Sequence, residues 1–137
     1  MTLAIIELLA TKDPTNADRQ RELSVCHEKL GEMLLAQKDV AGALAEYRLD
    51  LAIAERVAAK DPANLGWQTD LARSQEKVGD ALLAPGASAE RLAHYKAALA
   101  IARRLEIAAP NDADLRSLAA ELAAKVATCC DAKRIKP

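Results

Sequence analysis

Apolar residues recur along this chain three or four positions apart, which is the period of an α-helix. The clearest stripe consists of Leu23, Cys26, Leu30 and Leu34. After the turn-like stretch QKDV, at 37–40, the same rhythm resumes with Leu44, Tyr47 and Leu51. The pattern predicts helices near residues 2–12, 16–37, 40–60, 64–84, 88–108 and 112–133.

Proline turns separate these helices at KDPTN (12–16), at KDPAN (60–64) and at the partial copy APND (109–112). A residue before proline is disfavoured in the α conformation, so the preceding helix ends there. Either Asp13 and Asp61 then cap the next helix, with proline at its first position, or the cap lies two or three residues later. The residues at that later position are Asn16, Asn64 and Asp112. Asp39 and Ser88 are the expected caps of the helices that follow the other breaks.

The chain contains an internal repeat with a period of about 48 residues. Residues 13–60 and 61–108 align without a gap, and about 20 of the aligned positions are identical. The motif LAI, at 3–5, returns at 51–53 and 99–101, so the chain opens inside a unit. We therefore predict a single domain over 1–137, made of a half repeat (1–12), two repeats (13–60 and 61–108) and a C-terminal half repeat or cap (109–133).

Composition supports an all-α fold. Half of the residues are apolar, but these are mainly Ala and Leu, Phe is absent and there is one Trp. Nineteen basic residues nearly cancel twenty acidic ones, so nothing indicates nucleic acid or an anionic membrane as a partner. A net charge this close to zero leaves room for self-association.

We expect a soluble, cytoplasmic protein. The chain has no apolar run long enough to span a membrane. Its start, MTLAIIELLATKD, lacks the basic region and the cleavage pattern of a signal peptide. Three cysteines do not make a disulfide framework.

Two segments resemble the first helix of a tetratricopeptide repeat: HEKLGEML at 27–34 and QEKVGDAL at 75–82. In that family a small residue lets the two helices of a unit cross closely, and the resemblance gives this role to Gly31 and Gly79. The signature of the second helix, Ala followed four residues later by an aromatic residue, is present as Ala43 and Tyr47. The next unit departs from it, because Arg91 stands in place of the Ala.

The unit is longer than the family's usual repeat of about 34 residues. It looks like the long-helix arrays of bacterial proteins, and NLGWQTDL at 64–71 fits a phrase that recurs in them. The resemblance implies an α-α superhelix of about six antiparallel helices, in which each unit stacks on its neighbours. It further implies a concave groove lined by the first helix of each unit. The implied function is a scaffold, not an enzyme, that binds a protein or peptide without a cofactor.

Ten residues beside the stripe of Leu30 and Gly31 are expected to face that groove: Val25, Glu28, Lys29, Glu32, Leu35, Arg73, Glu76, Lys77, Asp80 and Leu83. One interpretation is a mixed, acid-leaning groove for a peptide that carries basic residues. The other is a solvated face with ion pairs within and between helices. The acidic residues Glu28 and Glu32 would repel a terminal carboxylate, which argues against the clamp by which some family members hold chaperone tails.

Candidate chemistry is sparse. The sequence contains no phosphate-binding loop, HExxH motif or nucleophile elbow, and we expect no catalytic, cofactor or metal site. Cys26 and His27 are adjacent on a helix, so their side chains do not face each other. Cys129 and Cys130 could oxidise and cross-link chains. Two adjacent cysteines without other ligands are only weak evidence for a metal site. Trp67 is expected to pack against the preceding helix, with a place at a partner interface as the alternative.

Self-assembly is a rival function. The first helix is the second helix of a unit without its partner, and it is apolar nearly all round. Its side chains are expected to dock on another copy or on a larger assembly: Leu3, Ile5, Ile6, Leu8 and Leu9. The half-unit start also favours a piece of a longer repeat array. The other end, DAKRIKP, is a more polar cap.

Overall fold

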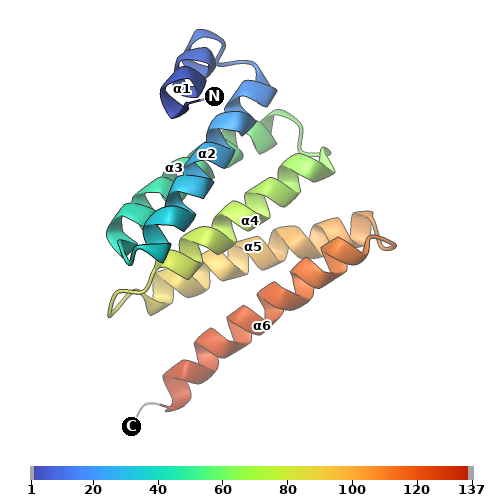
Figure 1. Ribbon diagram of the computed structural model, residues 1–137. Coiled ribbons are helices and arrows are strands. Elements are labelled where there is room, and N and C mark those ends of the chain that lie inside the picture. The colour runs from blue at the N-terminus through green and yellow to red at the C-terminus, as the bar shows by residue number, and fades with distance from the viewer. Residues whose placement is uncertain (1, 136–137) are drawn as a thin grey trace.

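The structure is a computed structural model that describes the backbone of residues 2–135 and the side chains of residues 2–129. Within that range it contains six helices and no strand, which confirms the all-α prediction (Figure 1). The helices are α1 (Leu3–Lys12), α2 (Ala17–Ala36), α3 (Val40–Lys60), α4 (Leu65–Ala81), α5 (Ser88–Ala108) and α6 (Ala113–Ile135).

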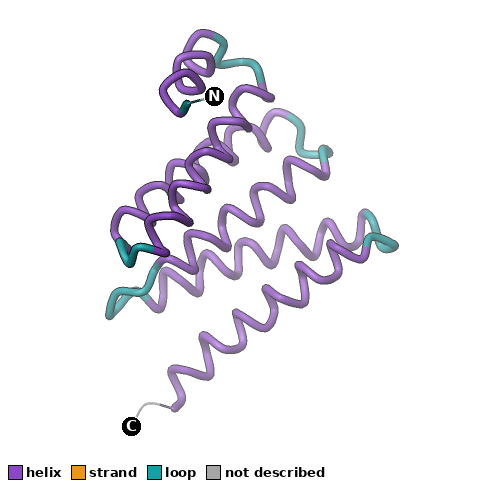
Figure 2. Tube along the Cα trace, viewed as in Figure 1, coloured by secondary structure: helices purple, strands orange, loops and turns teal. Residues whose placement is uncertain are grey.

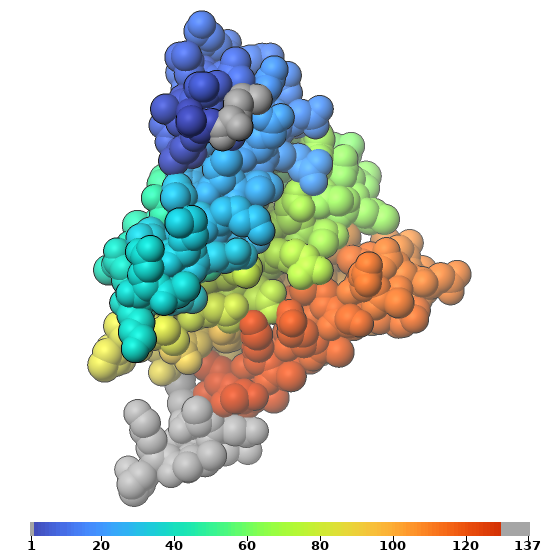
Figure 3. Space-filling model, viewed as in Figure 1, coloured from blue at the N-terminus to red at the C-terminus, as the bar shows by residue number. Residues whose placement is uncertain are grey.

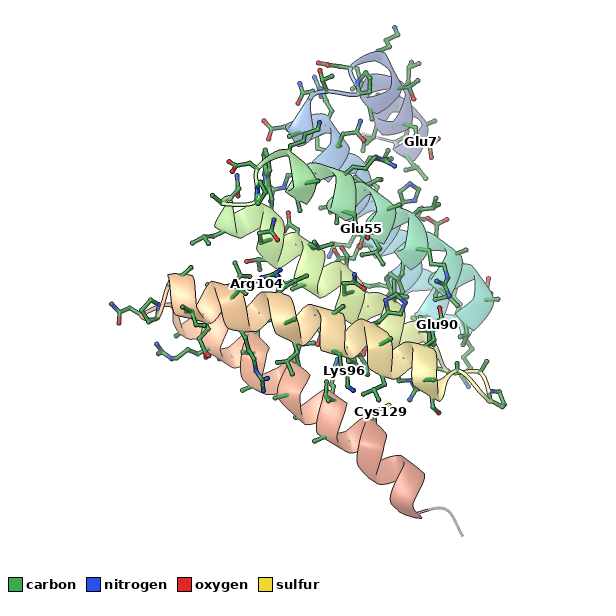
Figure 4. All side chains as sticks on the ribbon, turned by 180° about the vertical axis from the view of Figure 1, so that it is seen from behind. Glu7, Glu55, Glu90, Lys96, Arg104 and Cys129 are labelled. Atoms are coloured by element: carbon green, nitrogen blue, oxygen red, sulfur yellow. The ribbon has the colours of Figure 1, made fainter. Side chains whose placement is uncertain are left out.

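The helices form two layers that are joined by short loops at their ends (Figure 2). α2, α4 and α6 lie side by side in one layer, which we call the front face (Figure 1). α3 and α5 lie behind it and are nearest to the viewer in Figure 4. α1 lies at one end of the stack, against α2, and each helix packs against the next one in the chain.

The boundaries agree with the prediction to within a few residues, except at the end of α4. This helix ends at Ala81 and not near residue 84. Two nitrogens of Arg91 donate to the carbonyl oxygen of Leu82, Nε at 2.9 Å and Nη2 at 2.5 Å. Ala84 precedes a proline, which disfavours a helical conformation there. Arg91, which departs from the family pattern, thus holds the shortened end of α4.

The structure shows which residue after each proline turn caps the following helix. Asn16 and Asn64 cap α2 and α4, since their side chains accept from the backbone N–H groups three residues later. Asp13 lies instead at the end of the preceding helix, as its equivalent in the second turn does. Asp39 caps α3 as predicted. The prediction for Ser88 is wrong: it is the first residue of α5, and the cap position falls on Ala87, which has no side chain to accept a hydrogen bond.

The repeat is visible in three dimensions at the crossings of α2 with α3 and of α4 with α5. A Cβ atom on Gly31 would lie 2.5 Å from Tyr47 Cε1, and one on Gly79 would lie 2.7 Å from Tyr95 Cε1. Both distances are well inside van der Waals contact, so a side chain would push the tyrosine ring away. This confirms that the two glycines permit a close crossing.

Two buried clusters hold the layers together. One lies between α2, α3 and α4, and its members include Tyr47, Leu51, Val78 and Leu82. The other lies between α4, α5 and α6, and its members include Leu99, Ile101, Leu105, Leu118 and Leu122. α4 contributes to both clusters. The core is therefore continuous along the stack, as expected where each repeat buries its apolar side on its neighbour.

Candidate functional site

The ten predicted groove residues all belong to α2, to α4 or to the stretch directly after α4. Figure 3 shows the front face that α2, α4 and α6 form. Several line one cleft, of about 270 Å³, between α2, α4 and α6: Glu28, Arg73, Glu76, Lys77 and Asp80. Val25 and Leu83 are exposed apolar residues, and Leu35 packs partly against the buried cluster of α2, α3 and α4. Half of the ten residues thus lie around one cleft, and the ten differ in accessibility.

Most charges of this face pair between neighbouring helices, in a pattern that returns from one unit to the next. Lys77 Nζ of α4 lies 3.4 Å from Glu32 Oε1 of α2. At the equivalent positions one unit later, Lys125 Nζ of α6 lies 3.0 Å from Asp80 Oδ1 of α4. We call this series of pairs the charge ladder. Because two of its acids already have a lysine partner, the face is less acidic toward a ligand than the sequence suggests.

Glu76 corrects one expectation about the groove. It was predicted to face a ligand, but it is only 5% exposed. Lys125 Nζ lies 2.9 Å from its Oε2 atom. Burial raises the pKa of Glu76, and a hydrogen bond shared with Glu121 raises it further, while Lys125 acts in the opposite direction. The residue joins α4 to α6 and is not free to meet a partner.

The two lysines of the ladder hold their charge firmly. For Lys77 burial alone would lower the pKa, but the hydrogen bond and the negative charge of Glu32 outweigh it, so that the pKa is raised. Lys125 has a raised pKa as well, because Glu76 and Asp80 together outweigh its burial. Lys77 and Lys125 therefore stay charged across the neutral pH range.

Two charges that line the cleft between α2, α4 and α6 have no ion-pair partner among the described residues. Glu28 is partly exposed and Arg73 is exposed, and among the described residues neither takes part in an ion pair. Both residues line the cleft above and also a second, smaller cavity next to Val25. An acid, a base and an apolar side chain are thus gathered on one part of the front face, between α2 and α4.

Lys125 and an ion pair between α2 and α4 were not among the predicted site residues. Lys125 occupies the position of Lys77 one unit later, so carrying the repeat register into α6 would have found it. Arg21 Nη2 lies 2.8 Å from Asp70 Oδ2. No sequence signal marks this second pair, because it depends on how α2 and α4 lie against each other and its arginine has no counterpart in the next unit.

Asp50 is a buried acid that the sequence analysis also missed. It is 2% exposed, and its carboxylate accepts hydrogen bonds from the hydroxyl groups of Ser24 and, at 3.0 Å, of Ser74. Burial raises the pKa of Asp50 to about 6, although the two hydroxyls lower it. A signal was present, since Asp50 stands three and four residues from Tyr47 and Ala54, on the buried stripe of α3.

The two histidines also join helices of one unit. His27 Nδ1 of α2 lies 2.6 Å from Glu46 Oε2 of α3. At the equivalent positions of the next unit the residue types are exchanged, and His94 Nδ1 of α5 lies 2.7 Å from Gln75 Oε1 of α4. Burial lowers the pKa of His94. Both imidazoles thus hold the packing of a helix pair.

Trp67 is half-buried at the start of α4 and lines the small cavity together with Ile53 and Val57 of α3. This is the position expected for packing against the preceding helix. Among the described side chains, no group of three or more His, Cys, Asp or Glu is placed to hold a metal ion. None of the described helices is long and apolar enough to cross a membrane.

The two cysteines with described side chains are held within the fold. Cys26 is half-buried, and Cys129 is buried with its Sγ atom 3.8 Å from the carbonyl oxygen of Ser88. The expectation that Cys129 and Cys130 cross-link chains depends on a side chain outside the described range, as does the polar cap DAKRIKP.

Comparison with known proteins adds no relative. No family model matches the chain, and no curated protein or solved structure gives a significant match. The surfaces of the helix stack are therefore the evidence that bears on function.

Proposed function

We propose that this protein is a non-enzymatic scaffold of the tetratricopeptide kind, whose front face forms the concave side of a superhelix and binds a protein or peptide. The observation that carries the proposal is the set of accessible groups between α2 and α4. Glu28 and Arg73 are free of ion pairs among the described residues and stand beside the exposed side chain of Val25. An apolar contact flanked by oriented charges suits recognition of a peptide.

The charge ladder defines which chemistry a partner would meet. Glu32 and Asp80 are neutralised by lysines of the next helix, so Glu28 is the acid between α2 and α4 that a partner can reach. A basic side chain of the partner would pair with Glu28, and an acidic one with Arg73. The partner that fits is therefore a segment carrying both signs of charge around an apolar residue.

The test is capture of proteins from an extract of the source cells by the immobilised chain. Reversing both free charges, Glu28→Lys with Arg73→Glu, preserves the net charge and is expected to remove the specifically captured proteins. The matched control, Glu55→Lys with Arg104→Glu, reverses two exposed charges on the back layer (Figure 4) and is expected to leave capture unchanged. If the front-face variant captures the same proteins as the wild type, the front face is not the binding surface.

Self-association through α1 is the second candidate function, and exposed apolar side chains on this helix support it. Ile5 and Leu8 are exposed, Leu3 and Leu9 are partly exposed, and Ile6 is buried against the rest of the protein. The predicted docking surface is thus reduced to one side of α1, which carries Ile5 and Leu8. Exposed apolar groups of this kind are typical of contact sites.

A further inference from the structure

The outer side of α1 repeats, in register, a surface that another helix covers elsewhere in the protein. Ile5, Ile53 and Ile101 occupy the same position of the repeated unit. Ile53 is 4% and Ile101 is 6% exposed, but Ile5 is 47% exposed. Ile53 lines a cavity between α2 and α4, the front helices on either side of α3. α1 packs mainly against α2, whereas α3 packs against both α2 and α4, so no described helix covers the outer side of α1 as α2 covers α3.

The charge ladder has an open position at the same end. Lys29 of α2 stands where Lys77 stands in α4, and Lys77 pairs with Glu32 of the preceding front helix at 3.4 Å. The side chain of Lys29 is 66% exposed, and its one ion-pair partner among the described side chains is Glu32 of its own helix, at 3.8 Å. Lys29 is thus placed to meet an acidic residue on a helix that would precede α2 in the front layer.

A second charge is open in the same way. Glu22 of α2 stands where Asp70 stands in α4, and Asp70 accepts from Arg21 of the preceding front helix, at 2.9 Å from Nε and 2.8 Å from Nη2. Within the part of the chain that the structure describes, Glu22 pairs with Arg19 of its own helix, at 3.8 Å, and with no other helix. The exposed side of α2 therefore presents an acid and a base whose equivalents in α4 are both bound by another helix.

We propose that the outer side of α1 and α2 binds an amphipathic helix with a basic residue and, eleven residues later, an acidic one. Arg21 and Glu32, which serve α4 in this way, have that spacing, and eleven residues are about three turns, so both project from the same face. The basic residue would pair with Glu22 and the acidic one with Lys29, while apolar residues of the helix cover Ile5. This is the helix-in-groove mode of recognition, with charges that set its register.

Charge favours such a partner over a second copy of this chain stacked end to end. In that arrangement α6 of one copy would cover α1 of the next. α6 has Ser117 and Thr128 at the positions of Arg21 and Glu32, so it offers neither charge. Glu28 and Arg73 line cavities between α2 and α4 to which Glu22, Lys29 and Ile5 do not contribute. A negative result for the front-face proposal would therefore not contradict binding of a helix at α1 and α2, and a negative result there would not contradict the front-face proposal.

The test uses a labelled synthetic peptide with the sequence of residues 16–37, because α2 already covers α3 and pairs with α4 in this manner. Its binding to the full chain is measured by fluorescence anisotropy, at chain concentrations where light scattering gives a monomer. We expect Lys29→Glu in the chain to weaken binding about fivefold, since an exposed ion pair becomes a repulsion. The peptide variant Glu32→Lys is expected to restore binding to Lys29→Glu and to weaken binding to the wild type.

Apolar contact is tested separately. Ile5→Asp is expected to weaken binding of the peptide about tenfold, whereas Ile107→Asp, which changes an exposed isoleucine of α5, is expected to have no effect. The proposal is overturned if Lys29→Glu binds both peptides as the wild type does. It is also overturned if a peptide of residues 113–135, which lacks both charges, binds as well as the first, and that result would favour end-to-end stacking of copies.

Discussion

At the scale of single residues, Asp50 is the group whose chemistry departs most from that of an ordinary surface residue. Its carboxylate is buried between α2, α3 and α4, and only the hydroxyls of Ser24 and Ser74 compensate for the lost hydration. The next unit has Ala72 and Ala98 at the positions of Ser24 and Asp50, so the fold does not require an acid there. The cost of the buried charge should therefore be measurable as a dependence of stability on pH.

We predict that the stability of the wild type, relative to Asp50→Asn, falls as the pH rises from 4 to 7. The pKa of Asp50 is raised from 3.8 to about 6 by burial, so between these values the folded state binds more protons than the unfolded state. Stability then decreases with rising pH, by about 3 kcal/mol once both states are ionised. Urea unfolding at several pH values measures the difference, in which the contributions of other carboxylates cancel.

The control for this prediction is Glu55→Gln, which removes an exposed carboxylate from the same helix (Figure 4). Its stability relative to the wild type should change much less over the same pH range. A difference between wild type and Asp50→Asn that stays constant from pH 4 to pH 7 would show that the carboxyl group of Asp50 titrates normally.

At the scale of elements, the two units differ in how their second helices begin. Asp39 Oδ1 accepts from the backbone N–H of Gly42, 2.9 Å away, and so caps α3. The same position before α5 holds Ala87, and its helix begins without a side-chain cap. One orphan N–H group that is satisfied in the first unit therefore depends on water in the second.

We predict that Ala87→Asp stabilises the protein by about 0.5–1 kcal/mol, the lower part of the range for an N-cap because Ala87 is partly packed against the core. Thermal unfolding followed by circular dichroism measures the gain as a rise in Tm. Ala89→Asp adds the same charge to the first turn of α5 but lies outside the cap position. Equal gains from the two variants would attribute the effect to charge alone and contradict the cap.

Much of the architecture could be predicted because its signals are local. The stripe of Leu23 to Leu34, the asparagines after each proline turn and the glycines at the crossings all act within one helix or one unit. What could not be predicted depends on distant parts of the chain. Glu76 is buried by Lys125 and Glu121 of α6, and α4 ends early because Arg91 of α5 binds Leu82. The groove predicted from single helices therefore contained more unpaired charges than the structure has.

At the scale of the whole molecule, the stack has unequal ends. The C-terminal side of the front layer ends in α6, where Ala124 and Thr128 stand at the positions that Glu76 and Asp80 hold in α4. The opposite end retains the charges Glu22 and Lys29 and the apolar side chain of Ile5, all exposed. Contacts with other molecules are therefore expected at the α1 end.

We predict that the chain self-associates through that end and that Leu8→Glu abolishes the association. Leu8 is exposed on α1, so the charge is not expected to disturb the monomer. Light scattering should give a mass above that of the monomer for the wild type, rising with concentration, and the mass of the monomer for Leu8→Glu. Ile107→Glu, at an exposed isoleucine of α5, should behave as the wild type. A monomer for both the wild type and Leu8→Glu would exclude self-association.

The exchanged histidine pairs bear on a hazard that similar repeats share, namely that a helix of one unit packs on a helix of another. Correct assembly matches His27 with Glu46 and Gln75 with His94. If α2 packed on α5 instead, two imidazoles would face each other. If α4 took the place of α2 beside α3, Asp50 would lose the hydroxyl of Ser24 and face the methyl group of Ala72. The differences between the units thus favour the native helix pairs over exchanged ones during folding.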